Sequence, residues 1–400
     1  MCGIVGYIGP RNATPILMDG LKRLEYRGYD SAGLALVNLE GQLQILKKSG
    51  KIVALEAAVA LEDPRGHCGI AHTRWATHGA PTEPNAHPHW SPSREIALVH
   101  NGIIENAEAL RGYLADEGYT FCSETDTETV VHLIDHLWKD GMTLEGAVAA
   151  ALVHVEGTYG IAVVSSRDPE KIVVARLGSP LLIGVGNGGE MLAGSDAAAV
   201  VSHTREVVYL DDGDYAVLTP GAYRTFHLDH GEVSRSVHQV TWDVAAIEKG
   251  GYEHFMLKEI FEQPTSLRNV LRGRLLEDIG DARLGGIAAH QFNLGQVRRI
   301  VITACGTSWH AGLVGEYMLE ELAHIPVSVE YASEFRYRNP VVEDGTLVLA
   351  ISQSGETADT LAALREARQR GATTMGIVNV VGSSIARDTN FGIYLHAGPE

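Results

Sequence analysis

Short apolar runs bounded by turn residues recur along residues 1–240, and such runs are typical of β-strands. They cover residues 3–9, 33–38, 69–73, 96–101, 159–165, 172–176, 181–185 and 215–218. Apolar positions at helical spacing predict helices over 15–25, 105–117 and 127–139. The last of these begins with Thr125-Asp126-Thr127-Glu128, the pattern of a capping box. Many strands with few helices predict packed sheets covered by helices, an α+β layered domain over residues 1–240.

The rhythm changes in the second part of the chain. Glu248-Lys249-Gly250-Gly251 reads as a linker, and we assign residues 241–285 to a linker and a helical connector, with a helix over 255–272 interrupted at Pro264. From residue 298 onward, strands at 299–303, 327–330, 347–352, 374–379 and 391–396 alternate with helices at 308–322 and 358–370. This alternation predicts βαβ units and a parallel sheet over residues 286–400, with ligands at the carboxyl ends of the strands.

Composition narrows the class of protein. The 400 residues are 45% hydrophobic and 20% charged, which suffices for two or three domains with sizeable cores. The formal net charge of -18 disfavours a broad nucleic-acid surface. No apolar stretch approaches the roughly 18 residues of a membrane span, and the N-terminus lacks the basic region of a signal peptide. Four scattered cysteines without a CxxC pair fit reduced thiols in a cytoplasmic protein.

Cys2 directly follows the initiator methionine, so removal of Met1 would leave a cysteine that carries its own α-amino group. A thiol is only slightly ionised at pH 7 and benefits from a nearby base. A free α-amine titrates near ~7.7, so it can take the thiol proton and later protonate a leaving amine. The alternative is that residue 2 is an ordinary small residue before a strand. The apolar run that starts at Gly3 weakens this alternative, since it would hold the cysteine rigidly.

Five sequence blocks resemble the N-terminal-nucleophile (class II) glutamine amidotransferases, and they occur in the order found in that family. The blocks are Met1–Gly6, Leu24–Gly33, Ala71–Gly79, Val99–Asn106 and Ser123–Glu128. The resemblance implies a four-layer αββα sandwich and the hydrolysis of glutamine by Cys2. It also implies that Thr77, His78 and Trp75 line the glutamine pocket and that Arg27 lies beside the nucleophile.

The chemistry of a glutaminase explains four further residues, each with a structural alternative. Arg74 suits a bidentate clamp on the glutamine carboxylate, although a surface salt bridge is the commoner fate of an arginine. Asp126 suits the ammonium group of glutamine, but it also fits a carboxylate at a helix start. Asn101 and the backbone N–H of Gly102, at the exit of a strand, match an oxyanion hole. An Asn-Gly hairpin turn is the local alternative, and the two interpretations are compatible.

Histidines are frequent between residues 67 and 89, which raises the question of a zinc site. Their spacing fits neither an HExxH motif nor a Cys/His finger, and Cys68 has no cysteine close in sequence. We therefore expect no metal.

Two loops in the second part of the chain lie where a predicted strand passes into a helix. They are Ile302–Ser308 and Ala350–Thr357. Hydroxyl groups, a glycine and free N–H groups at a helix start form an anion cradle. No P-loop lysine or GxGxxG motif is present, so nucleotide binding is disfavoured; simple helix capping remains the alternative. The second loop is similar to sugar isomerase (SIS) domains. The resemblance implies that a hexose phosphate is held by Thr307, Ser308, Ser352, Gln353, Ser354 and Thr357, with Cys305 a buried residue at the strand end.

A class II glutaminase joined to an SIS module resembles the amidotransferase family that converts L-glutamine and D-fructose 6-phosphate to L-glutamate and D-glucosamine 6-phosphate. The resemblance implies no metal or organic cofactor, and a homodimer formed through SIS modules. Members carry a second SIS module and a tail with a ring-opening lysine. We therefore expect the chain to be a fragment that is competent only as a glutaminase. Two alternatives stay open: another class II enzyme, such as an amidophosphoribosyltransferase, or a regulatory sugar-phosphate-binding protein with a vestigial glutaminase.

Overall fold

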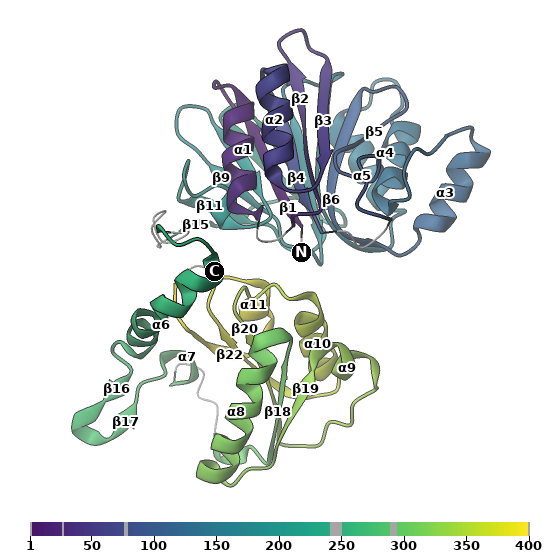
Figure 1. Ribbon diagram of the computed structural model, residues 1–400. Coiled ribbons are helices and arrows are strands. Elements are labelled where there is room, and N and C mark those ends of the chain that lie inside the picture. Colours follow the sequence, from purple (N-terminus) through teal and green to yellow (C-terminus); the bar gives the residue numbers. More distant parts are fainter. Residues whose placement is uncertain (1, 26–27, 76–78, 241–249, 289–293, 399–400) are drawn as a thin grey trace. The chain divides into compact units, whose positions relative to one another are not determined.

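The computed structural model describes residues 2–25, 28–75, 79–240, 250–288 and 294–398. The chain divides into two compact units, Met1–Val244 and Ala245–Glu400 (Figure 1). They are called unit 1 and unit 2 below, and each is described by itself. Among the helices of the described ranges, none has the length and apolar content needed to cross a membrane.

Unit 1 contains two antiparallel sheets, each covered by helices on its outer side (Figure 1). In spatial order the first sheet consists of β15 (Val237–Gln239), β11 (Glu206–Tyr209), β9 (Leu182–Val185), β10 (Met191–Gly194), β1 (Gly3–Ile8), β4 (Gly66–Arg74), β2 (Ser31–Asn38) and β3 (Leu43–Ser49). Helices α1 (Ala13–Arg23) and α2 (Ile52–Glu62) pack against it. The β4 strand lies between β1 and β2, so its residues are buried along almost its whole length.

The second sheet of unit 1 carries the other pair of covering helices. In spatial order it consists of β14 (Gly231–Val233), β13 (Ala222–His227), β12 (Asp214–Thr219), β8 (Ile172–Leu177), β7 (Gly157–Ser165), β6 (Ile96–Ile104) and β5 (His89–Trp90). Helices α4 (Asp126–Leu137) and α5 (Leu144–Leu152) pack on it, and α3 (Ala107–Asp116) packs on α4. The four layers confirm the predicted αββα sandwich.

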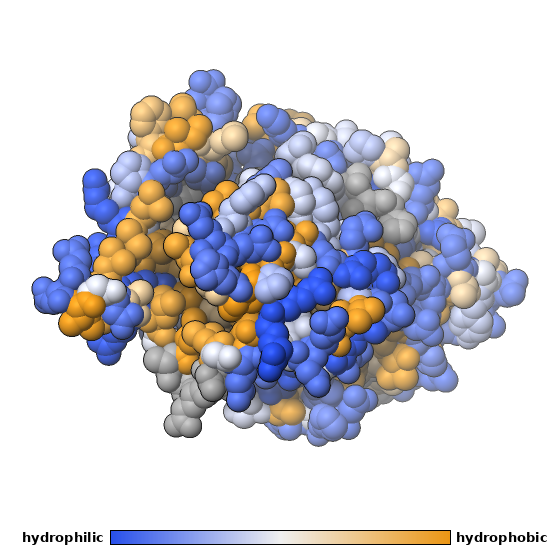
Figure 2. Space-filling model, turned by 90° about the horizontal axis from the view of Figure 1, so that it is seen from below, coloured by the Kyte–Doolittle hydropathy of each residue, from blue (hydrophilic) through white to orange (hydrophobic). Residues whose placement is uncertain are grey.

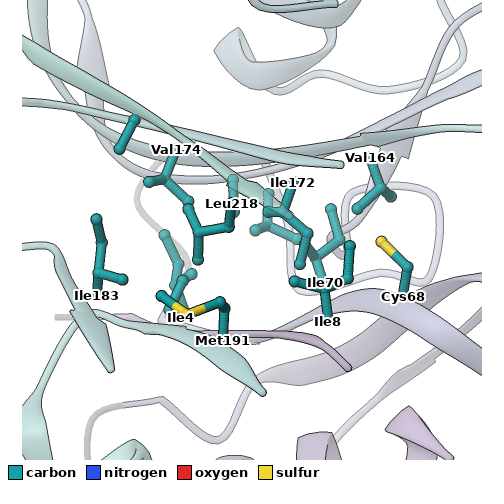
Figure 3. Close-up of a cluster of buried hydrophobic side chains, with 14 of the residues drawn as sticks. Ile4, Ile8, Cys68, Ile70, Val164, Ile172, Val174, Ile183, Met191 and Leu218 are labelled. Carbon is teal, nitrogen blue, oxygen red and sulfur yellow. The ribbon is translucent and has the colours of Figure 1, made fainter. Parts of the chain in front are cut away.

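A hydrophobic core fills the space between the two sheets, and strand alternation decides which residues enter it. Figure 3 shows Ile4 and Ile8 of β1 facing Ile172 and Val164 of the opposite sheet. On each strand every second side chain points into this core. Cys2 lies two residues before Ile4, so its side chain points to the same face as Ile4 and Ile8 and lies at the end of the core where β1 begins. The candidate glutamine site is built there.

Unit 2 is a doubly wound α/β domain. Its sheet has the order β19 (Val327–Tyr331), β18 (Arg299–Ala304), β20 (Thr346–Ser352), β21 (Thr373–Val378) and β22 (Phe391–Tyr394), and all neighbouring strands are parallel. Helices α7 (Gly285–Ala288) and α8 (Gly306–Ala323) cover one face; α9 (Ala332–Tyr337), α10 (Ala358–Gln369) and α11 (Ser384–Asp388) cover the other. The parallel sheet predicted from the βαβ rhythm is confirmed.

The segment before that sheet differs from expectation at one point. Helix α6 (Phe255–Leu271) continues through Pro264, whereas the sequence predicted an interruption there. Proline removes one backbone donor, and at an exposed position the remaining helical bonds on either side carry the helix onward. A short hairpin of β16 (Leu275–Leu276) and β17 (Asp281–Ala282) follows α6. Residues 241–249 of the predicted linker lie outside the described residues.

The start of α4 confirms one prediction and corrects another. Thr125 is the N-cap residue, as expected, but its side chain makes no capping hydrogen bond. The Glu128 carboxylate, which a capping box would direct to the backbone N–H of Thr125, instead accepts from the backbone N–H groups of Cys122 and Ser123 and from the Ser123 hydroxyl. The helix start therefore ties down the loop that precedes it.

Candidate active sites

The Cys2 thiol lies against the end of β4. Its Sγ accepts a hydrogen bond from the backbone N–H of Trp75 at 3.2 Å and lies 3.5 Å from the Trp75 carbonyl oxygen. Burial raises the pKa of this thiol above its ordinary value, while the Trp75 N–H bond and the charge of Arg74 act in the opposite direction. A thiol in this setting needs a base before it can act as a nucleophile.

Asn101 lies beside the same residue, although the two come from different sheets. Its Nδ2 donates to the Cys2 carbonyl oxygen at 3.0 Å. Asn101 and Gly102 lie within the continuous strand β6, so the hairpin turn considered for this Asn-Gly pair, and its placement at a strand exit, are wrong. The antiparallel partner β7 continues past both residues and keeps them in the sheet.

Gly102 departs from regular strand geometry. Its φ of 134° lies in the region that favours glycine, and a Cβ there would stand 2.1 Å from the Thr158 carbonyl oxygen. No other residue fits without moving β7. The local reorientation of the backbone beside Asn101 therefore depends on glycine at this position.

Arg74 is almost fully buried at the end of β4, so it is not the surface salt-bridge residue of the alternative interpretation. Its guanidinium donates to the carbonyl oxygens of Gly79 and Ala80, each at 3.4 Å. Burial lowers the pKa of Arg74, and the carboxylate of Asp126 is among the charges that oppose this effect. Arg74 lies an even number of residues after Cys68 and Ile70 on β4, so its side chain points to the same face of the strand as theirs. This places it at the same end of the core as Cys2.

Asp126 and Trp75 complete the part of the predicted site that the structure describes. Asp126 is buried at the first turn of α4, and its Oδ2 accepts from the backbone N–H of Ile104 at 2.9 Å. Trp75 is 45% exposed and makes an edge contact with Tyr29 at a centroid distance of 5.2 Å. The structure thus brings Cys2, Arg74, Asn101 and Asp126 together. Arg27, Thr77 and His78 lie outside the described residues.

Two residues that the sequence did not single out support the turn beside Arg74. Asn85, which is buried, donates from Nδ2 to the Ala80 carbonyl oxygen at 3.0 Å and to the Glu124 carboxylate at 2.9 Å. The backbone N–H of Glu124 in turn donates to Asn85 Oδ1 at 2.9 Å. The Asn85–Ala80 bond thus holds one of the two carbonyl groups that the guanidinium contacts. Asn85 and Glu124 are 39 residues apart in sequence, so no local motif could have indicated their contact.

Three of the histidines that raised the question of zinc, His72, His87 and His89, form a buried row instead, whereas His67 is exposed and His78 lies outside the described residues. The ring of His87 packs on His72 at 4.2 Å and on His89 at 4.9 Å. Burial lowers the pKa of all three well below the ordinary value, to about 3 for His72. Over the described residues, no group of three or more His, Cys, Asp or Glu side chains is arranged to hold a metal ion.

The two hydroxyl-rich loops of unit 2 lie at neighbouring strand ends, because β18 and β20 are adjacent and parallel. Thr307 and Ser308 open α8, and Thr357 is the N-cap of α10. Cys305, the N-cap of α8, is half-buried, which corrects its prediction as a buried residue; the Thr360 hydroxyl donates to its Sγ at 3.8 Å.

Within the loop after β20, the side chains bond mainly to their own backbone. Ser352 Oγ accepts from the Gly355 N–H at 3.0 Å and lies 3.2 Å from the Thr357 hydroxyl. Ser354 Oγ accepts from the Glu356 N–H at 3.2 Å. Gln353 is half-buried beside them. Gly355, with φ of 68°, leaves no room for a Cβ, which would stand 2.0 Å from Ser383 Oγ. The loop is therefore a tight polar turn that opens onto the N-terminus of a helix.

Comparison with known proteins accounts for both units. Residues 72–202 match the model of a glutamine amidotransferase domain, and residues 293–400 match that of an SIS domain. Over its whole length the chain is 58% identical to the glutamine–fructose-6-phosphate aminotransferase (isomerizing) of Chlorobaculum tepidum and 51% identical to that of Bacteroides thetaiotaomicron. The chain belongs to the glutamine–fructose-6-phosphate aminotransferase family. It spans 66% and 65% of the length of these two relatives.

A solved structure supports the fold independently. Glutamine phosphoribosylpyrophosphate amidotransferase from B. subtilis is 21% identical and aligns over 94% of this chain and 81% of its own, with a TM-score of 0.50. Similarity at this level of identity concerns the fold alone. It agrees with the layered architecture of unit 1 and adds nothing about the substrate.

Proposed function

We propose that unit 1 hydrolyses L-glutamine and that unit 2 binds D-fructose 6-phosphate, as the two parts of an enzyme that forms D-glucosamine 6-phosphate and L-glutamate. The observation that carries this proposal is the meeting of Cys2, Arg74 and Asn101 at one end of the inter-sheet core. The names of the 51–58% identical relatives support the substrates and the overall reaction.

The reaction at Cys2 follows from the groups around it. Sγ would attack the side-chain amide carbon of glutamine and form a tetrahedral intermediate, whose oxyanion would accept hydrogen bonds from Asn101 Nδ2 and the Gly102 N–H. Collapse of the intermediate would release ammonia and leave a γ-glutamyl thioester, which water would then hydrolyse to glutamate. In the overall reaction the ammonia would pass to the carbonyl carbon of the open-chain ketose.

The base in this scheme would be the α-amino group of Cys2, which requires removal of Met1. The raised pKa of the thiol supports this assignment, because a mostly protonated thiol gains from a base on its own residue. The amine, once protonated, would then supply a proton to the departing ammonia.

Glutamine would be held at both ends of its amino-acid group. Arg74 would take the carboxylate and Asp126 the ammonium; both are buried, so their charges act in a medium of low polarity. Trp75 is exposed at the mouth of the site and would cover the bound ligand. We assign Thr77, His78 and Arg27 to the same site on the family pattern.

In unit 2 the sugar phosphate would bind across the two loops at the carboxyl edge of the sheet. The phosphate would meet the N-terminus of α10 together with the hydroxyls of Ser352, Ser354 and Thr357. Thr307, Ser308 and Gln353 would contact the sugar from the neighbouring positions. The parallel pairing of β18 with β20, which places both loops at one edge, supports this assignment.

We further propose that the protein acts as a homodimer in the cytoplasm. Exposed hydrophobic side chains follow one face of α8, namely Val314, Tyr317, Met318 and Leu322. Figure 2 shows hydrophobic surface at several places on the face of the molecule seen from below. Such surface commonly marks an interface. All four cysteines are free thiols, which suits a reducing compartment.

Two assays test the proposal. Release of glutamate from L-glutamine, compared with release of aspartate from L-asparagine, tests unit 1. A rise in melting temperature with D-fructose 6-phosphate, absent with D-fructose, tests unit 2. Activity on neither amide would refute the glutaminase, and equal responses to the two sugars would refute the phosphate site.

A further inference from the structure

The carboxamide of Asn101 has two ends, and a different residue holds each. Nδ2 donates to the Cys2 carbonyl oxygen, while Oδ1 lies 2.9 Å from Nε2 of His72. A carboxamide rotated by 180° would present Oδ1 to the nucleophile, where it would repel a developing oxyanion. The donor on Oδ1 therefore decides whether Asn101 can stabilise negative charge.

The proton on His72 can be placed from its partners. Nε2 also lies 3.1 Å from the His100 carbonyl oxygen. Both neighbours are oxygens that only accept, so Nε2 carries the hydrogen and donates to each. His72 is fully buried, and its low pKa keeps the ring neutral, so a single tautomer is present at any working pH. The other nitrogen, Nδ1, has no hydrogen-bond partner among the described residues.

The position of the ring is fixed on several sides. His72 lies in β4, paired with Ile4 on one side and with Gly33 on the other. The ring of His87 packs against one face of the His72 ring. The Nδ1 of His87 accepts from the His100 backbone N–H at 3.4 Å, which holds His87 in place. His72 and Arg74 are two residues apart, so they point into the same inter-sheet space. The buried Nδ1 of His72, unpaired within the described part of the chain, costs stability. An apolar residue at position 72 would avoid this cost, so the histidine is favoured only if its Nε2–H has a role.

We propose that His72 is a positioning residue for the oxyanion hole, which keeps Asn101 Nδ2 directed toward Cys2. The inference rests on the proposed glutaminase function. His72 touches neither glutamine nor Cys2 in this account and acts only through Asn101 and the backbone at His100.

Four variants test this role through steady-state glutamine hydrolysis. His72→Phe keeps a flat ring without the donor, whereas His72→Gln offers an amide N–H at nearly the reach of Nε2. We expect His72→Phe to lower kcat about 10- to 100-fold with KM changed less than about twofold, because one oxyanion donor is worth roughly 10²- to 10³-fold. His72→Gln should recover most of that loss. In an Asn101→Ala background, His72→Phe should lower kcat by no more than about threefold.

His132→Phe is the matched control. His132 is also buried, and its ring packs on Tyr119 and Phe121 rather than on His87 or Asn101. We expect its kcat to equal that of the parent. If His72→Phe does not fold, His72→Asn, whose amide reaches only the Nδ1 position, takes its place with the same expected loss.

Three outcomes would overturn the positioning role. They are a parental kcat in His72→Phe, an equal loss in His72→Gln, or the same loss from His72→Phe with and without Asn101. Failure of the proposed function would look different, since the parent chain would then show no glutamine hydrolysis that depends on Asn101. An active parent with a slow Asn101→Ala variant and a fast His72→Phe variant would overturn the inference and leave the glutaminase intact.

Discussion

The two units build their candidate sites in different ways. In unit 1, Cys2, Arg74, Asn101 and Asp126 come from four separate elements, and they meet only because two sheets pack face to face. In unit 2, the proposed sugar-phosphate contacts come from two short loops at neighbouring strand ends, and the side chains of the loop after β20 bond mainly within that loop. The first site therefore depends on the long-range fold, and the second depends on local turns and helix starts.

The two units also differ in how deeply their titratable side chains are buried. Arg74, Asp126 and the histidine row are buried in unit 1. The described histidines of unit 2, His254, His310, His324 and His396, are all exposed. The protonation of these unit 1 histidines is consequently coupled to the folding of that unit.

The largest expected effect is that of removing the Cys2 thiol, which should affect the site in unit 1 and leave the site in unit 2 unchanged. Cys2→Ala should lower glutamine hydrolysis at least about 10⁴-fold, because loss of a nucleophile removes the covalent pathway. The melting-temperature rise with fructose 6-phosphate should persist in the same variant. Parallel loss of both responses would show that the two sites are not independent.

Acid should weaken unit 1 before unit 2. The unfolded chain protonates its histidines near pH 6.5, while burial keeps the pKa of His72, His87 and His89 far lower in the folded state. Between these pKa values the unfolded state binds more protons, so the free energy of unfolding falls as the pH falls. Each histidine contributes about 1 kcal/mol between pH 6.5 and 5.5, because its unfolded form is already half protonated at pH 6.5, so the three together contribute roughly 3 kcal/mol.

Urea unfolding at pH 7 and pH 5.5 measures this effect, with the exposure of each unit followed by hydrogen exchange. His87→Phe should reduce the pH dependence by about one third. Unit 2 unfolding first on acidification would contradict the comparison.

Arg74→Ala should raise KM for glutamine about 100-fold, because two charge-assisted hydrogen bonds to the substrate carboxylate are lost. Its kcat should change less than its KM. Arg23→Ala is a suitable control, since Arg23 pairs with Asp19 on α1. If Arg74→Ala kept a KM within twofold of the parent, the carboxylate of glutamine would have to be bound by another cationic side chain.

The smallest effect is expected from the hydroxyls of unit 2. Ser354→Ala combined with Thr357→Ala should abolish the melting-temperature rise with fructose 6-phosphate. The unliganded protein should lose only about 1 kcal/mol of stability, because these groups lie in a partly exposed loop. Glutamine hydrolysis should be unchanged. A sugar-phosphate response that survives both substitutions would move the site elsewhere.

The same contrast explains what could be predicted from sequence. The loops of unit 2 were predicted because strand, turn and helix start lie together within a few residues. Asn101-Gly102 by itself fits a turn, since the β7 partner that keeps it in a strand lies far along the chain. The roles of His72 and Asn85 were missed for the same reason. Strand alternation after Cys68 and Ile70 does place His72 on the face of Arg74, and this was the one available signal.

We propose above that Cys2, with a free α-amino group, is the glutaminase nucleophile. Reaction with a glutamine analogue that carries a diazoketone in place of the amide, followed by mass analysis of the peptides, tests it most directly. We expect an N-terminal peptide without Met1 and with one adduct on Cys2, and unmodified Cys68, Cys122 and Cys305. An adduct on one of those three thiols, or an unmodified Cys2 in an active protein, would contradict it.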